Sequence, residues 1–227
     1  MKNNLTVLTL TLLMAGAASA TPVTFLNLNE LLSSVNMYTL TNNGGTSNTL
    51  SVVNGSVVFN FSVPNALGTG FRNGVFNFTA NSTTPATVGS GNYTEQGFSG
   101  SGSILDSLTN TIAFSWTSGP TATFTGAVGG TSATFNDSTP PNTEINYISP
   151  YLTFPATISE SFSFGFTSAI PAYLVGAGGF LDDATGSGVA TFSSNPGPSG
   201  APEPATAFLL GSALVGLALI GRKRLAR

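Results

Sequence analysis

The chain of 227 residues contains no cysteine and no histidine, and no lysine lies between Lys2 and Lys223. The first two absences exclude disulfide bonds, Ser-His-Asp and Cys-His catalysis, and the usual zinc and copper sites. The missing lysines exclude Ser-Lys and Schiff-base chemistry from almost the whole chain. Carboxylates remain as candidate catalytic groups. Most of them stand in predicted turns, where acids favour solubility, so we predict that the protein is not an enzyme and needs no cofactor.

Charge of either sign is also scarce, because charged residues make up 7% of the chain against about 25% in ordinary globular proteins. Between residues 21 and 201 the only basic residue is Arg72. The same region has eight acids and therefore a net charge of −7: Glu30, Glu95, Asp106, Asp137, Glu144, Glu160, Asp182 and Asp183. Nucleic acids and anionic membrane surfaces are bound through clusters of Lys and Arg. We therefore expect this region to bind neither.

The C-terminus contains a long uncharged hydrophobic span and most of the basic residues of the chain. Residues 205–221 form an uncharged span rich in Ala, Leu, Val and Gly, which as a helix is roughly 25 Å long and predicts a short transmembrane helix. Before this span, Pro202 and Pro204 hold Glu203 in an extended segment. After it stands a basic cluster that stops transfer and holds the C-terminus in the cytoplasm, namely Arg222, Lys223, Arg224 and Arg227.

Pro202-Glu203-Pro204, the start of the hydrophobic span at residues 205–211 and the basic cluster together resemble the PEP-CTERM sorting domain of exported proteins from Gram-negative bacteria. The resemblance covers residues 202–227. It implies recognition by an exosortase, which is a membrane-embedded cysteine protease or transpeptidase, and an association with exopolysaccharide and biofilm. The alternative interpretation is an ordinary single-helix anchor with a chance Pro-Glu-Pro.

The N-terminus agrees with export. Lys2 is followed by an apolar stretch from Leu5 to Ala15, and Ala18-Ser19-Ala20 provides a small-residue cleavage site. Residues 1–20 are therefore predicted to be a signal peptide for the general secretory machinery, with the mature chain beginning at Thr21. An uncleaved N-terminal anchor is the alternative. The protein is expected to pass through an inner-membrane-anchored intermediate and then reach the cell surface or the extracellular matrix.

Between the two signals, hydrophobic residues recur with the period of β-strands. Val57, Phe59, Phe61 and Val63 alternate with polar residues, and the same alternation appears in 76–80, 112–117 and 162–166. Turn signals separate such segments, among them Asn42-Asn43-Gly44-Gly45, Asn54-Gly55, Gly129-Gly130 and Asn136-Asp137. We predict that residues 21–192 form an all-β domain, an antiparallel β-sandwich or jelly-roll.

Two segments depart from the β pattern. Asn29 is a predicted helix N-cap, followed by the apolar stripe of Leu31, Leu32 and Val35. Residues 193–201 are rich in Ser, Pro and Gly and predict a flexible tether between the β-domain and the sorting signal. Such a tether would leave Pro202-Glu203-Pro204 accessible to a processing enzyme.

Few residues of the β-domain are candidates for binding. Asp182 and Asp183 offer oxygen ligands for Ca²⁺, but their spacing is not that of an EF-hand, so a solvated turn is the favoured interpretation and we predict no metal site. Arg72 is interpreted as a loop-tip charge or as the partner of a carboxylate. Trp116 shares a face with Ile112 and Phe114 and is predicted to lie in the core. Four tyrosines near turns are predicted to be more exposed, and so to be better placed to stack on a sugar: Tyr93, Tyr147, Tyr151 and Tyr173.

The sequence favours an exported cell-surface or extracellular-matrix protein, and the association with exopolysaccharide comes from the family resemblance alone. One alternative is a carbohydrate-binding module whose ligand is the matrix polysaccharide. Another is a self-associating fibre protein, because strands without lysine lack a common protection against edge pairing.

Overall fold

The computed structural model describes residues 22–31, 36–63, 70–138, 145–155, 159–195 and 197–200. The predicted signal peptide with its cleavage site, the sorting motif at 202–204, the helix at 205–221 and the basic tail lie outside these ranges. Glu144 lies outside them as well. Within the described ranges the only helix is one 3-10 turn, η1 (Ala177–Gly179). These ranges contain no helix with the length and hydrophobicity needed to span a membrane.

The described chain is all-β, as predicted, and every pair of strands is antiparallel. The strands are β1 (Val23–Glu30), β2 (Tyr38–Asn42), β3 (Asn48–Phe61), β4 (Arg72–Ser82), β5 (Thr87–Gly89), β6 (Asn92–Asp106), β7 (Thr111–Ala127), β8 (Ala133–Ser138), β9 (Asn146–Ile148), β10 (Leu152–Thr153), β11 (Ser159–Ile170), β12 (Ala184–Asn195) and β13 (Ser199–Gly200).

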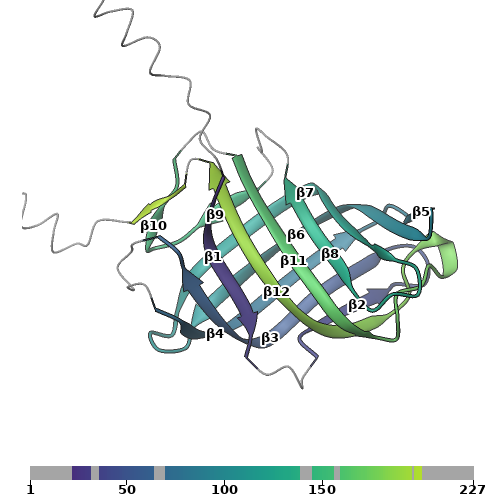
Figure 1. Ribbon diagram of the computed structural model, residues 1–227, viewed down its shortest axis with the longest axis horizontal. Coiled ribbons are helices and arrows are strands. Elements are labelled where there is room, and N and C mark those ends of the chain that lie inside the picture. Colours follow the sequence, from purple (N-terminus) through teal and green to yellow (C-terminus); the bar gives the residue numbers. More distant parts are fainter. Residues whose placement is uncertain are drawn as a thin grey trace, which may run out of the picture.

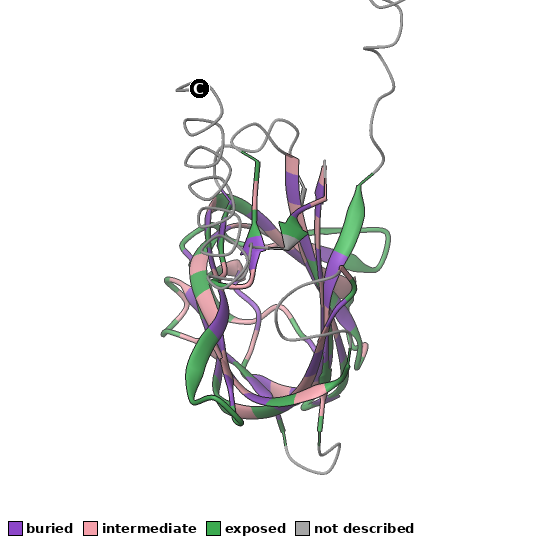
Figure 2. Ribbon diagram, turned by 90° about the vertical axis from the view of Figure 1, so that its left-hand side faces the viewer, coloured by how far each residue is buried: buried purple, intermediate pink, exposed green. Residues whose placement is uncertain are grey.

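Eight strands form a closed barrel in the order β6-β4-β3-β1-β12-β11-β8-β7, and β7 pairs again with β6. Figure 1 shows the barrel from the side and Figure 2 looks into the ring of strands. The pairing of β1 with β12 joins the two ends of the described chain. The predicted sandwich or jelly-roll is not confirmed. Alternation marks which side chains face a core, but it does not distinguish two facing sheets from one ring.

The barrel interior is filled by aromatic and aliphatic side chains. Val57, Phe59 and Phe61 are buried, which confirms the predicted alternation. Trp116 lies in the core as predicted, with its ring centroid 4.8 Å from that of Phe192. Each large apolar side chain that is fully buried stabilises the fold by about 2–3 kcal/mol relative to an exposed one.

Ile112 does not share the buried face of Trp116. Its side chain is 53% exposed, whereas Ala113 and Phe114 are both buried. The pairing of β6 with β7 shifts register between Ile104 and Leu105, opposite this segment. An irregularity of this kind adds a residue to one strand and breaks strict alternation. The buried face predicted for this strand therefore includes Phe114 and Trp116 but not Ile112.

A segment at residues 171–183, which includes η1, closes one end of the barrel, at the right of Figure 1. The Gly129 amide donates to the Tyr173 carbonyl at 2.7 Å, and the Ala86 amide donates to the Gly179 carbonyl at 2.9 Å. The buried Asn48 side chain donates to the Leu181 carbonyl at 3.0 Å. We call this segment the cap. The two described chain ends lie at the opposite, left-hand end.

Two predictions of local structure are corrected. Asn29 and Glu30 belong to β1, so no helix is capped at Asn29, and Leu32 and Val35 lie outside the described residues. Asn54-Gly55 lies inside β3, where it forms an irregularity and not a turn. Asn54 has a φ of 52°, a conformation that Asn tolerates better than most residues. The signal for a turn therefore marks a bulge.

The boundary of the β-domain also moves. Asn136 and Asp137, which predicted a turn, lie in β8. β12 extends to Asn195, and β13 pairs with β10, with Ser199 opposite Thr153. Much of the predicted tether at 193–201 is therefore part of the sheet structure, because backbone pairing depends on neighbouring strands and not on local composition.

Candidate functional site

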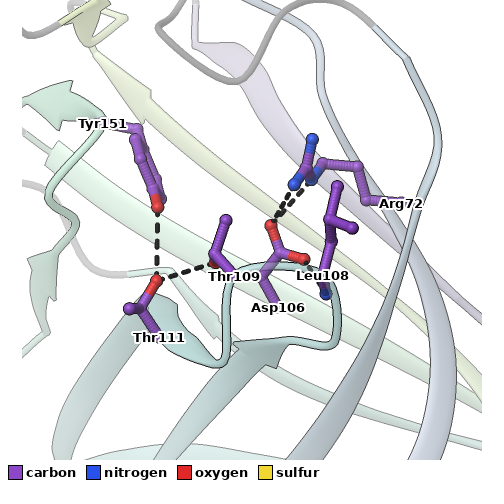
Figure 3. Close-up of polar contacts among 6 residues, drawn as sticks. All are labelled: Arg72, Asp106, Leu108, Thr109, Thr111 and Tyr151. Carbon is purple, nitrogen blue, oxygen red and sulfur yellow. Dashed lines mark hydrogen bonds and ion pairs between the residues drawn. The ribbon is translucent and has the colours of Figure 1, made fainter.

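A polar site lies at the end of the barrel opposite the cap, where β4 begins and β6 ends. Arg72 Nε and Nη2 lie 2.7 and 2.6 Å from Asp106 Oδ2 (Figure 3). The other oxygen of Asp106 accepts the Leu108 amide at 2.8 Å. Asp106 is fully buried and Arg72 is 19% exposed. This arrangement confirms the interpretation of Arg72 as the partner of a carboxylate.

Apolar side chains and hydroxyls surround this ion pair. Phe71 and Leu108 are 72% and 81% exposed, and together with the ion pair they line an open pocket of about 410 Å³. Nearby, Thr111 Oγ1 lies 2.8 Å from Thr109 Oγ1 and 3.3 Å from Tyr151 Oη (Figure 3). We call this region the Phe71 pocket. Its chemistry suits a neutral ligand that has both an apolar face and hydroxyl groups.

Replacing Arg72 by Met is expected to lower the free energy of unfolding by about 2–3 kcal/mol, because it leaves the buried Asp106 carboxylate without its cation. Urea unfolding measures this loss. Asp106→Asn alone removes the charge but keeps an acceptor for the Leu108 amide. The double variant should therefore lose less than the sum of the two single variants, and strict additivity would show that the two side chains are not coupled.

The prediction that most acids stand in turns is wrong, because Glu95, Asp106, Asp137 and Glu160 lie in strands and are buried. Burial raises the pKa of Glu95 to about 8, and the Leu181 backbone and the Ser82 side chain oppose this shift. At neutral pH Glu95 is therefore mainly protonated. Burial also raises the pKa of Glu160 to about 7, against the opposing effect of a backbone hydrogen bond at Tyr147.

The prediction of exposed tyrosines is wrong for three of the four residues. Tyr93, Tyr147 and Tyr173 are buried, and Tyr151 is half-buried. Tyr173 belongs to the cap, and its hydroxyl is hydrogen-bonded to that of Tyr38. Tyr147 donates to the Ser161 carbonyl at 2.5 Å. Proximity to a turn does not decide exposure, because Tyr93 in β6 and Tyr147 in β9 still point to one side of the sheet.

Asp183 joins the cap to β2, whereas Asp182 makes a backbone hydrogen bond within the cap. Asp183 Oδ1 accepts the Asn42 amide at 2.6 Å, and the Asp182 amide donates to the Leu174 carbonyl at 2.9 Å. Among the described residues no three side chains of His, Cys, Asp or Glu are grouped so as to hold a metal ion. The structure therefore assigns Asp183 a hydrogen bond in the fold and brings no further carboxylate to the proposed Ca²⁺ ligands.

Sequence reasoning missed Phe71, the most exposed aromatic side chain of the described chain. Its neighbours Gly70 and Arg72 gave a signal for a loop, and a large apolar residue in a loop is a reason to look for a binding surface. No protein-family model, curated protein or solved structure matches this chain. The functional conclusion therefore depends on the residues and the geometry of this chain itself.

Proposed function

We propose that this protein is exported, is sorted through Pro202-Glu203-Pro204 and the following helix, and acts at the cell surface or in the extracellular matrix beside exopolysaccharide. The inner membrane holds it before an exosortase processes it. The observation that supports this proposal is the three-part C-terminal signal, in which motif, apolar span and basic cluster follow one another. The residues of this signal act in sorting and have no part in a reaction of the β-domain.

The barrel suits such processing. Its two described ends lie close together, because a Cβ on Gly197 would stand 3.0 Å from Val23 Cβ. They lie at the end away from the cap. Removal of a signal peptide before Thr21 and of a sorting signal at 202–204 would leave every barrel strand in place. The body then needs no membrane segment to complete its core.

The structure bears differently on the two alternative functions. A carbohydrate-binding module is favoured by the outer face of the barrel, where serine, threonine and asparagine replace the usual charged residues. The hypothesis of a self-associating fibre receives less support, because the closed ring pairs its long strands on both sides. Short strands such as β5 are the free edges in the described chain, and short edges pair poorly with other molecules.

Deleting the exosortase from the producing cells is expected to leave the protein in the membrane fraction with its basic tail still attached. Fractionation with an antibody against the barrel measures the location. Replacing Glu203 by Ala in cells that keep the enzyme should also cause retention if the charged residue is read. Normal release in both strains would contradict sorting by this signal.

A further inference from the structure

The outer wall of the barrel carries a row of neutral polar side chains that crosses four adjacent strands. In the register of the sheet, Thr79 of β4 lies opposite Ser101 of β6, which lies opposite Thr117 of β7, which lies opposite Asn146 of β9. All four side chains are exposed. A second row lies beside it, two residues along each strand: Asn77, Ser103, Ser115 and Ile148. Together these rows line an open groove of about 360 Å³.

The hydroxyls of this groove have no partners within the described chain. Thr79, Ser101 and Thr117 make no side-chain hydrogen bond with any residue that the structure describes. The wall formed by β1, β8, β11 and β12, at the front of Figure 1, differs. There Ser163 Oγ donates to Asn136 Oδ1 at 2.6 Å, and similar pairs join neighbouring strands. The hydroxyls of the groove are thus available to an external molecule, whereas several polar side chains of the other wall are bonded to one another.

Charge and spacing define what fits this groove. Its lining has no charged side chain, so an anionic ligand finds no counter-charge there and a cationic one finds no carboxylate. Strands are about 4.8 Å apart, which is close to the length of one sugar residue in an extended chain. Each strand step therefore offers one hydrogen-bonding group to each sugar. Ile148, 59% exposed at one edge, adds an apolar surface for a sugar ring.

We propose that the groove across β4, β6, β7 and β9 binds an extended strand of neutral polysaccharide, lying across the strands. The row from Thr79 to Asn146 supplies the hydrogen bonds, because each threonine or serine hydroxyl and the side-chain amide of Asn146 can both donate and accept. This proposal rests on the proposed location beside exopolysaccharide, and it adds a ligand class and a binding surface to it.

Affinity electrophoresis of the full-length protein in a non-ionic detergent tests the groove. The gels contain hydroxyethyl cellulose or galactomannan as neutral probes, or alginate as an anionic one. We expect the neutral probes to retard the protein. Thr79→Val/Thr117→Val keeps the shape of both side chains but removes two hydrogen-bonding groups, and should weaken binding about 10-fold or more. The matched control, Thr134→Val/Thr167→Val, changes two exposed threonines of β8 and β11 on the other wall and should bind like the wild type.

Several results would overturn the groove as the binding surface. They are equal losses in the two double variants, unchanged binding by Thr79→Val/Thr117→Val, retardation by alginate alone, and no retardation by any neutral probe. A loss on Phe71→Ala with the groove variant unaffected would transfer the site to the Phe71 pocket. Each of these leaves the sorting proposal intact, because membrane retention in cells without the exosortase is measured separately.

Discussion

Gly102→Val is expected to destabilise the protein by about 3 kcal/mol or more, because Gly102 lies directly against the indole of Trp116. A Cβ at this position would stand 2.2 Å from Trp116 Cη2, far inside van der Waals contact. The indole has no free direction in which to move, since it stacks on Phe76 and Phe78 at centroid distances of 5.7 and 5.8 Å. Overpacking of a core usually costs about 1–3 kcal/mol, and more where nothing yields.

Gly165→Ala is the matched control for this change, because it also adds a Cβ to a glycine inside a strand. The nearest atom to that Cβ is Val189 Cγ2 at 3.6 Å, which is ordinary contact. Urea unfolding should therefore place Gly165→Ala within about 1 kcal/mol of the wild type. Trp116→Leu should partly rescue Gly102→Val by removing the ring. Equal stability of the two glycine variants would show that the indole does not occupy this position.

The free energy of unfolding is expected to fall as the pH rises from about 5 to about 8, opposite to the usual behaviour of a carboxylate that forms an ion pair. Burial raises the pKa of Glu95 from 4.5 to about 8. Between these values the folded protein holds a proton that the unfolded chain releases, so raising the pH favours unfolding. The contribution of Glu95 to stability is fully present below its pKa in the unfolded chain. It is lost as the pH rises through its pKa in the folded protein, and the total loss is on the order of 4 kcal/mol.

Thermal or urea unfolding at several pH values measures this slope. Glu95→Gln keeps the shape of the side chain and cannot ionise, so it should remove most of the slope. Glu160, whose pKa is raised to about 7, adds a smaller slope of the same sign that Glu160→Gln removes. A wild-type slope that persists in the Glu95→Gln variant would show that Glu95 is not the group responsible.

The sequence predicts the strands well where alternation is strong. The buried Phe76 and Phe78 of β4 and the buried Phe162, Phe164 and Phe166 of β11 stand where the period-2 pattern places them. The closed ring is not predictable in this way, because it depends on which strands pair. β1 and β12 are far apart in the chain, and the sequence of neither strand indicates that it pairs with the other. Pairing is decided by the fit of whole faces.

The candidate sites were harder to predict than the strands. Trp116 was assigned to the core correctly, whereas Tyr93 and Tyr173 were expected to be exposed and are buried. Their neighbourhood of turn residues obscured the fact that each points into the barrel. The groove row was equally hidden, since Thr79, Ser101 and Thr117 are separated in sequence and become neighbours through sheet register alone.

Mass spectrometry of the intact protein released by the producing cells tests sorting most directly. The proposed route gives a chain that begins at Thr21 and has lost Arg222, Lys223, Arg224 and Arg227. The same protein from cells without the exosortase should keep this basic cluster and remain in the membrane fraction. A released protein whose mass includes the complete C-terminus would contradict the proposal, because the signal would then act only as an anchor or have no role in release.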